Sequence, residues 1–162
     1  MSATASKVEF RRLELRDLNP IEVIERASYP TPWSRSMFAG ELAKPSSLSL
    51  GAFDPENGEL LGYLIISRYV DAWHVMNLAV APAHRRRRIA TGLLERLFEL
   101  TAGEGRRGYT LEVRVSNEIA IRLYERAGFR PRGIRRGYYT DNREDALIMW
   151  RDPAVPGEAG NG

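Results

Sequence analysis

The stretch formed by residues 77–94 changes from a strand pattern to a helix pattern within a few positions. An apolar run ends at Pro82, four consecutive arginines follow, and Ile89, Leu93 and Leu94 then recur with helical spacing. A strand, a turn and a helix in this order leave the first N–H groups of the helix without intrahelical acceptors, at the end where the helix dipole favours negative charge. The junction therefore predicts an anion site suited to phosphate.

The four arginines also allow a simpler interpretation, because runs of like charge are usually solvated surface or interaction patches. Residues 1–81 carry 8 Lys and Arg against 10 Asp and Glu, whereas residues 82–162 carry 16 against 11. All 16 of the basic residues in the second half are Arg, which contacts phosphate in a bidentate manner better than Lys does. A phosphate-bearing ligand and RNA both remain candidates at this point.

Length and composition limit the class of protein. A chain of 162 residues corresponds to about one domain. It has no Cys and 2 His, which excludes disulfides and a thiol nucleophile and argues against a metal site, so no metal is expected. No apolar run approaches the ~20 residues that cross a bilayer, and the first residues lack the apolar core of a signal peptide. A soluble, cytoplasmic protein without membrane contact is expected, and no pattern indicates its oligomeric state.

Periodicity and turn signals predict seven strands and four helices, which makes the chain an α/β protein with a mixed sheet. The strands are expected at residues 8–15, 48–53, 60–67, 73–81, 109–115, 129–134 and 146–150. The helices are expected after Asp17 (with Ile21, Val23, Ile24 and Ala27 on its apolar face), from Ser34 to Leu42, from Ile89 to Ala102, and from Asn117 to Ala127. Asp17, Ser34 and Asn117 are predicted caps. Residues 1–7 and 152–162 are expected to be flexible termini.

The 77–94 stretch resembles the acetyl-CoA motif of the GCN5-related N-acetyltransferases, which is usually written Gln/Arg-x-x-Gly-x-Gly/Ala after the fourth strand. Arg85 matches its first position and Ala90 its last, whereas Arg88 stands where the first Gly is usual. The resemblance implies a single domain with a mixed, mostly antiparallel sheet. It also implies that the CoA pyrophosphate is bound by backbone N–H groups, namely those of Arg86, Arg87, Arg88, Ile89, Ala90 and Thr91. Arg85, at the first motif position, is a further residue expected to bind the cofactor.

Blocks in the second half are more specific. Leu-Glu-Val-Arg-Val-Ser-Asn at 111–117, Leu-Tyr-Glu at 123–125, Gly-Phe at 128–129, Arg-Arg-Gly-Tyr-Tyr at 135–139 and Arg-Glu-Asp-Ala at 143–146 resemble the bacterial ribosomal-protein-alanine N-acetyltransferases. With Pro-Trp-Ser at 32–34, the resemblance covers about residues 8–151. It implies acetyl-CoA as cosubstrate and a protein N-terminus, that of a ribosomal protein beginning with alanine, as acceptor, with no nucleic acid required.

The resemblance also implies catalytic roles. A free α-amino group has a reference pKa of ~7.7–8.0 and must lose a proton before it attacks a thioester. Glu112 matches the family's general base, and Tyr124 matches the acid that protonates the CoA thiolate. Each has a structural alternative, because Glu112 could be a surface carboxylate paired with Arg114, and Tyr124 could be a core residue on the apolar face of a helix.

The remaining candidates line the expected groove. Asn117 would contact the cofactor and cap its helix, and the backbone of Leu78, Ala79 and Val80 would pair with the pantetheine arm, one N–H acting as oxyanion donor. Further candidates for the acceptor groove, each also explicable as packing, are His74, Trp33, Phe38, Tyr138 and Tyr139. Acetylation of lysine side chains or small amines, and a non-catalytic RNA-binding module, are the alternative functions.

Overall fold

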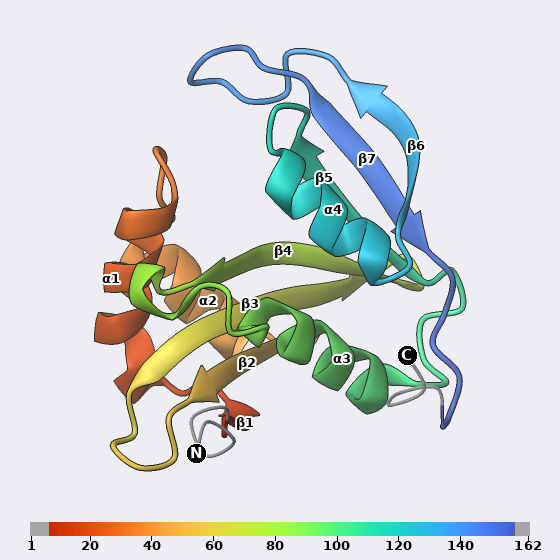
Figure 1. Ribbon diagram of the computed structural model, residues 1–162. Helices are drawn as coiled ribbons and strands as arrows, with labels where there is room; N and C mark the ends of the chain where they lie inside the picture. The colour runs from red at the N-terminus through yellow and green to blue at the C-terminus, as the bar shows by residue number, and fades with distance from the viewer. Residues whose placement is uncertain (1–6, 158–162) are drawn as a thin grey trace. The chain divides into compact units, whose positions relative to one another are not determined.

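The computed structural model describes residues 7–157 (Figure 1). Its strands are β1 (Glu9–Arg12), β2 (Ser47–Phe53), β3 (Leu60–Tyr69), β4 (Ala72–Val80), β5 (Tyr109–Arg114), β6 (Arg130–Arg135) and β7 (Ala146–Arg151). Its helices are α1 (Leu18–Ser28), α2 (Arg35–Ala43), α3 (Ile89–Thr101) and α4 (Glu118–Arg126), with short 3-10 turns at Leu15–Asp17 and Pro82–His84. The predicted order of strands and helices is confirmed. Most residues of the two predicted flexible termini, 1–6 and 158–162, lie outside the described residues.

The strands form one mixed sheet in the order β1-β2-β3-β4-β5-β7-β6. The β1/β2, β2/β3, β5/β7 and β6/β7 pairs are antiparallel, whereas β4 and β5 are parallel. The parallel register joins only Trp73 to Tyr109 and His74 to Thr110. The predicted α/β class with a mostly antiparallel sheet is therefore confirmed, and the single parallel pair is short.

The chain divides into two compact units, Met1–Ser67 with Met76–Leu97 and Arg68–Val75 with Phe98–Gly162. The core of the first unit consists of apolar side chains from α1, α2 and β2 to β4, namely Leu13, Leu18, Ile21, Ile24, Phe38, Phe53, Leu60, Tyr63, Ile65 and Ala79. Ile21 and Ile24 occupy the buried face of α1 as predicted, but Val23 is 60% exposed. Ala27 is exposed as well. The predicted apolar face is therefore wrong at both positions, because Val23 and Ala27 lie four residues apart and share a face of the helix that is on the solvent side.

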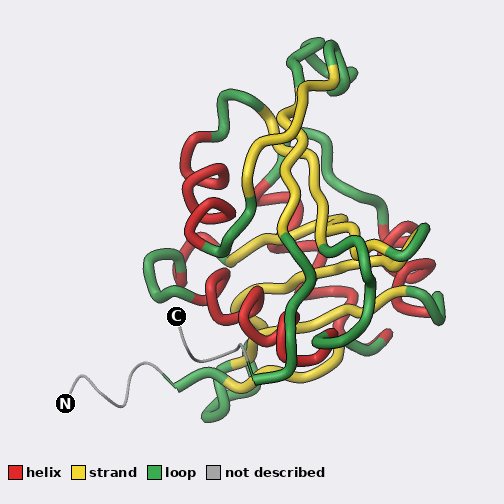
Figure 2. The backbone as a smooth tube through the Cα atoms, turned by 90° about the vertical axis from the view of Figure 1, so that its right-hand side faces the viewer, coloured by secondary structure: helices red, strands yellow, loops and turns green. Residues whose placement is uncertain are grey.

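The second unit packs α4 beside β5, β6 and β7, as the two views in Figures 1 and 2 agree. Its buried side chains include Tyr109, Leu111, Val113, Tyr124, Phe129 and Met149. Ala154, just beyond β7, is 2% exposed, and its carbonyl accepts a hydrogen bond of 3.2 Å from the Gly103 N–H. The tail thus packs at this residue, although the sequence pattern there predicts almost nothing to bury.

Two of the three predicted helix caps are present. The Ser34 hydroxyl accepts the Met37 N–H at 3.2 Å, and the Asn117 side chain accepts the Ala120 N–H at 3.2 Å. Asp17 makes no side-chain cap bond to α1. Its carboxylate instead accepts the Glu14 N–H at 2.7 Å and is paired with Arg11 at 3.0 Å, so the predicted cap at Asp17 is wrong. No helix within residues 7–157 is both long and apolar enough to cross a bilayer.

Candidate active site

The loop between β4 and α3 has the backbone shape of an anion site. Arg86 and Arg88 both adopt left-handed conformations, with φ of 71° and 59°. A left-handed residue followed by a right-handed helical one, as at Arg88 and Ile89, turns successive N–H groups toward one concavity that favours anions. The first bond of the helix runs from the Gly92 N–H to the Arg88 carbonyl at 3.0 Å, so the N–H groups of residues 89–91 have no intrahelical acceptor. The loop and the helix start therefore offer a series of donors to a pyrophosphate.

Two of the four arginine side chains in this loop are bound to protein groups. Arg85 donates from Nε to the Val80 carbonyl at 3.2 Å and from Nη2 to the Ser28 hydroxyl at 3.3 Å. Arg87 Nη1 lies 3.0 Å from His84 Nδ1, and His84 Nε2 lies 3.3 Å from a Glu59 carboxylate oxygen. These contacts anchor the loop from both sides. They favour a structural role for the Arg85 and Arg87 side chains over a freely solvated basic patch.

The β4 segment before this loop directs alternate backbone groups to opposite edges. The Ala81 N–H is bonded to the Leu61 carbonyl of β3 at 2.8 Å, so the backbone groups of Val80 and Leu78 point to the other edge. There the Leu78 carbonyl accepts the Tyr29 hydroxyl and the Val80 carbonyl accepts Arg85. The N–H groups of Leu78 and Val80 are the donors that this edge can offer to an extended ligand arm.

A buried carboxylate lies behind the same segment. Glu25 is 1% exposed, and its two oxygens accept bonds from the Trp33 N–H at 2.9 Å, the Asn77 amide at 2.9 Å and the Tyr63 hydroxyl. Burial and the Glu25 carboxylate raise the pKa of Tyr63, so its hydroxyl remains a donor. Glu25 thus links α1, β3, β4 and the loop before α2. The sequence interpretation missed it, because a single Glu in an amphipathic helix is normally solvent-exposed.

In the second unit, Glu112 is the centre of a small cluster. Its side chain is 24% exposed, and Oε2 lies 3.7 Å from Arg135 Nε on β6. Glu112 is opposite Ile148 of β7, which is opposite Gly133 of β6, so Arg135 reaches it across one strand. Arg114 instead pairs with Asp141 and Glu144. The alternative in which Glu112 is simply the partner of Arg114 is therefore wrong, and Arg135 is a neighbour that the sequence did not identify.

Two further predicted residues lie within the electrostatic influence of Glu112. Burial lowers the pKa of His74, and the Glu112 charge opposes that effect only in part, so the imidazole is neutral at pH 7. Burial raises the pKa of Tyr139 to about 12, with Arg114 opposing the shift and Glu112 adding to it. The Tyr138 and Tyr139 rings meet edge to face with their centroids 5.1 Å apart. The structure therefore brings Glu112, His74, Tyr138 and Tyr139 together.

The other predicted residues occupy different surroundings. Tyr124 is 8% exposed and contacts the Phe129 ring edge to face at 5.6 Å, so most of its ring is core, as its structural alternative predicts. Asn117 caps α4. Phe38 is 0% exposed and packs against Trp33 at 5.1 Å in the core of the first unit. Its predicted role as a groove wall is wrong, because a fully buried ring has no surface for a peptide. Trp33 is half-buried beside it.

Comparison with known proteins adds to this geometry. The acetyltransferase (GNAT) family matches residues 17–129. The [ribosomal protein bS18]-alanine N-acetyltransferase of Escherichia coli is 37% identical over 139 residues, which are 85% of this chain and 92% of that protein. The N-alpha-acetyltransferase RimI of Mycobacterium tuberculosis is 37% identical over 130 residues, 77% of this chain and 78% of that protein. A crystal structure of the ribosomal-protein-alanine N-acetyltransferase from Escherichia coli matches with a TM-score of 0.78 and 33% identity, covering 94% and 97% of the two chains.

Proposed function

Because the chain belongs to the acetyltransferase (GNAT) family, we propose that it transfers acetyl from acetyl-CoA to the α-amino group of a protein N-terminus. The proposed acceptor is a ribosomal protein that begins with alanine, as the name of the Escherichia coli relative states for that enzyme. The reaction then takes place in the cytoplasm, where ribosomal proteins are made. The observation that carries the proposal is the Glu112 cluster, in a chain that matches such relatives over most of its length.

The residues present fit the cosubstrate. Its pyrophosphate is an anion, and the loop with the left-handed residues Arg86 and Arg88 leads into the N–H groups of Ile89 to Thr91, which lack an intrahelical acceptor and can donate to it. Its pantetheine arm contains amides, which the N–H groups of Leu78 and Val80 can bind as an added strand would. The cosubstrate would supply an acetyl thioester, and one of these N–H groups is assigned in this proposal as the donor that polarises its carbonyl.

Glu112 accepts the proton of the acceptor ammonium in this proposal, directly or through water. It is partly exposed, and its pairing with Arg135 at 3.7 Å is longer than a hydrogen bond. An acceptor ammonium can therefore compete for the carboxylate. His74 is neutral, so it can accept or pass on a proton without repelling the ammonium. Tyr124 is assigned the protonation of the leaving thiolate, since a phenol of reference pKa ~10 is protonated at pH 7.

The acceptor is tested with three peptides and mass spectrometry of the products. One has the N-terminal sequence of ribosomal protein bS18, one has the same sequence with its α-amino group already acetylated and a lysine inside, and one begins with a bulky residue. The proposal expects release of CoA and acetylation of the α-amino group in the first peptide. Acetylation only of the lysine in the second peptide would overturn the α-amino assignment and favour the lysine alternative.

The base is tested with Glu112→Gln. Loss of a positioned base costs about 10²–10⁴-fold in turnover, whereas acetyl-CoA affinity measured by calorimetry should stay within about twofold, since Gln keeps the shape of the side chain. Glu104→Gln is the matched control, because Glu104 is an exposed carboxylate of the same unit, paired with Arg68 at 3.3 Å, and should retain wild-type turnover. Full activity of Glu112→Gln would exclude Glu112 as the base.

An RNA-binding module is the distant alternative, and the engaged side chains of Arg85 and Arg87 disfavour it. It expects tight binding of RNA that weakens steeply with salt, and no thermal shift with acetyl-CoA. Both measurements can be made on the same protein preparation.

A further inference from the structure

Residues 136–145 connect β6 to β7 and are called here the β6–β7 loop. This loop projects beyond the ends of the strands in both views of the backbone (Figures 1 and 2) and carries Tyr138 and Tyr139. Projecting loops are normally mobile, because few contacts oppose their motion. A groove wall has to be held still if it is to orient an acceptor. The contacts of the loop therefore decide whether Tyr138 and Tyr139 can orient an acceptor.

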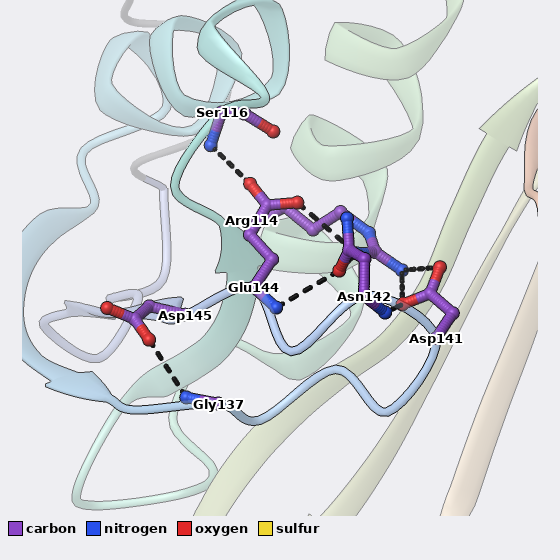
Figure 3. Close-up of polar contacts among 7 residues, drawn as sticks. All are labelled: Arg114, Ser116, Gly137, Asp141, Asn142, Glu144 and Asp145. Carbon is purple, nitrogen blue, oxygen red and sulfur yellow. Dashed lines mark hydrogen bonds and ion pairs between the residues drawn. The ribbon is translucent and has the colours of Figure 1, made fainter.

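One side chain of β5 reaches into the loop and contacts several of its residues. The Arg114 guanidinium donates to both carboxylate oxygens of Asp141 at 3.0 and 2.9 Å, to the side-chain Oδ1 of Asn142 at 3.1 Å and to a Glu144 carboxylate oxygen at 3.2 Å (Figure 3). Its Cζ atom lies 4.0 Å from the centroid of the Tyr139 ring. Only 23% of the Arg114 side chain is exposed, so these bonds are partly shielded from water.

A second layer of bonds extends this anchorage. The other Glu144 oxygen accepts the Ser116 N–H at 2.9 Å, and the Asp145 carboxylate accepts the Gly137 N–H at 2.8 Å (Figure 3). Within the loop, the Tyr139 N–H is bonded to the Glu144 carbonyl at 3.2 Å, and the Arg143 N–H to the Tyr139 carbonyl at 2.8 Å. The loop is thus closed around Tyr139 and tied to the end of β5.

The chemistry of Arg114 suits this task better than that of any other cation. A guanidinium is a planar fork with two terminal nitrogens, so Nη2 binds both Asp141 oxygens while Nη1 binds Asn142 and Glu144, and its face stacks on an aromatic ring. Lys carries a point charge and can make only part of this set. Arg114 also lies two residues after Glu112, and alternate residues of a strand share one face. The loop residues that Arg114 contacts are therefore held at a fixed position relative to Glu112.

We propose that Arg114 is a positioning residue that fixes the β6–β7 loop, and with it the Tyr139 ring, relative to Glu112. The proposal rests on the proposed function, since it makes Tyr139 part of the acceptor site. Arg114 acts through the loop and touches neither the acceptor nor the cosubstrate. Its replacement should weaken acceptor binding while cosubstrate binding is retained.

The test uses the full chain and two variants that break the same contact from opposite sides. Arg114→Lys removes the fork from β5, and Asp141→Asn removes the carboxylate from the loop. Arg122→Lys is the matched control, because Arg122 forms an exposed pair with Glu118 at 3.3 Å in the same unit. Circular dichroism and thermal unfolding verify that each variant is folded.

The first readout is amide hydrogen exchange of the free protein, followed by NMR at Gly137, Tyr139 and Arg143. Loss of charge-assisted bonds should speed exchange at these amides about tenfold or more in Arg114→Lys and Asp141→Asn, and leave it unchanged in Arg122→Lys. The double variant should exchange no faster than the faster single variant, since both changes break one contact. Exchange at the wild-type rate in Arg114→Lys would overturn the proposal.

The second readout separates positioning from a general loss of fold. KM for the acceptor peptide should rise about fivefold or more in both loop variants, whereas KM for acetyl-CoA should stay within about twofold. An equal rise of both constants would show a general structural role and overturn the positioning proposal. If the wild-type protein acetylates no N-terminal peptide, the proposed function fails, and the exchange readout still decides whether Arg114 holds the loop.

Discussion

Arg88 offers a sharp test of the phosphate-binding loop. It occupies the position where the family pattern has Gly, yet its φ is 59°, a conformation that favours Gly. A left-handed residue with a Cβ costs about 1–2 kcal/mol, and Gly avoids that cost. Gly also loses about 0.5–1 kcal/mol more backbone entropy on folding than Ala does. At position 88 Gly should therefore be more stable than Ala by about 0.5–1 kcal/mol.

The comparison of Gly with Ala removes the effect of the lost charge, because both Arg88→Gly and Arg88→Ala lack it. Arg96, in the interior of α3, is the matched control. There Gly should be less stable than Ala by about 1 kcal/mol, so the sign of the difference reverses between the two positions. Thermal and urea unfolding of the four variants measure it, and a net change of 1 kcal/mol shifts Tm by about 2–4 °C in a chain of this size.

A Gly variant that is less stable than the Ala variant at both positions would refute the left-handed conformation of Arg88. The same variants test the role of the backbone. Arg88→Gly keeps every N–H group of the loop, so its affinity for acetyl-CoA should stay within about threefold of wild type at high salt, where side-chain charge is screened. A large loss at high salt would show that the Arg88 side chain, and not the backbone, holds the cosubstrate.

Three further outcomes are expected. Glu25→Gln places an amide group among three donors in the core, and it should lower the free energy of unfolding by about 2–4 kcal/mol in urea titrations. The exposed control Glu95→Gln should change it by less than about 0.5 kcal/mol. Equal effects of the two substitutions would contradict a stabilising role of the hydrogen bonds to Glu25. The folded-state pKa of His74 is lower than its ordinary value of 6.5, so its contribution to stability is present above that pH and is lost as pH falls through the folded pKa. The free energy of unfolding of His74→Gln should therefore depend less on pH below 6.5 than that of the wild type. An NMR titration that places the His74 pKa above 6.5 would contradict the direction of this shift. Asn117→Ala should lower the free energy of unfolding by about 1 kcal/mol, measured by thermal unfolding, because the α4 cap is lost, and Asn117→Asp should restore most of it. An Ala variant as stable as wild type would show that the cap does not contribute to stability.

Features that depend on a few neighbouring residues were predicted correctly from the sequence. The Ser34 and Asn117 caps each bond an N–H three residues later, and the hairpin of β2 and β3 encloses the Asp-Pro and Asn-Gly turn signals. The predicted cap at Asp17 is wrong because it depends on a residue outside the local segment. The cap motif is present, but Arg11 on β1 lies 3.0 Å away and takes the carboxylate. Arg11 and the Glu14 N–H together occupy the carboxylate, so it does not bond the N–H groups of α1.

In the candidate site, too, contacts between distant segments could not be predicted from neighbouring residues. The neighbours of Glu112 depend on the register of β5, β7 and β6, which no local pattern encodes, so Arg135 replaced Arg114 as its ion partner. Released from Glu112, Arg114 holds the β6–β7 loop. The sequence is likewise compatible with either an exposed or a buried ring at Phe38, and packing against Trp33 and Tyr63 places the ring in the core.

The sequence by itself therefore determined the order of strands and helices, the strand-turn-helix junction and the family, because periodicity, turn residues and motif spacing are properties of short segments. The tertiary structure alone decided which charges meet. It buried Glu25 beneath donors from Trp33, Tyr63 and Asn77, and it turned Arg86 and Arg88 into left-handed residues. Such contacts join residues far apart in the chain, and their energies depend on burial and register, which arise only when the elements pack together.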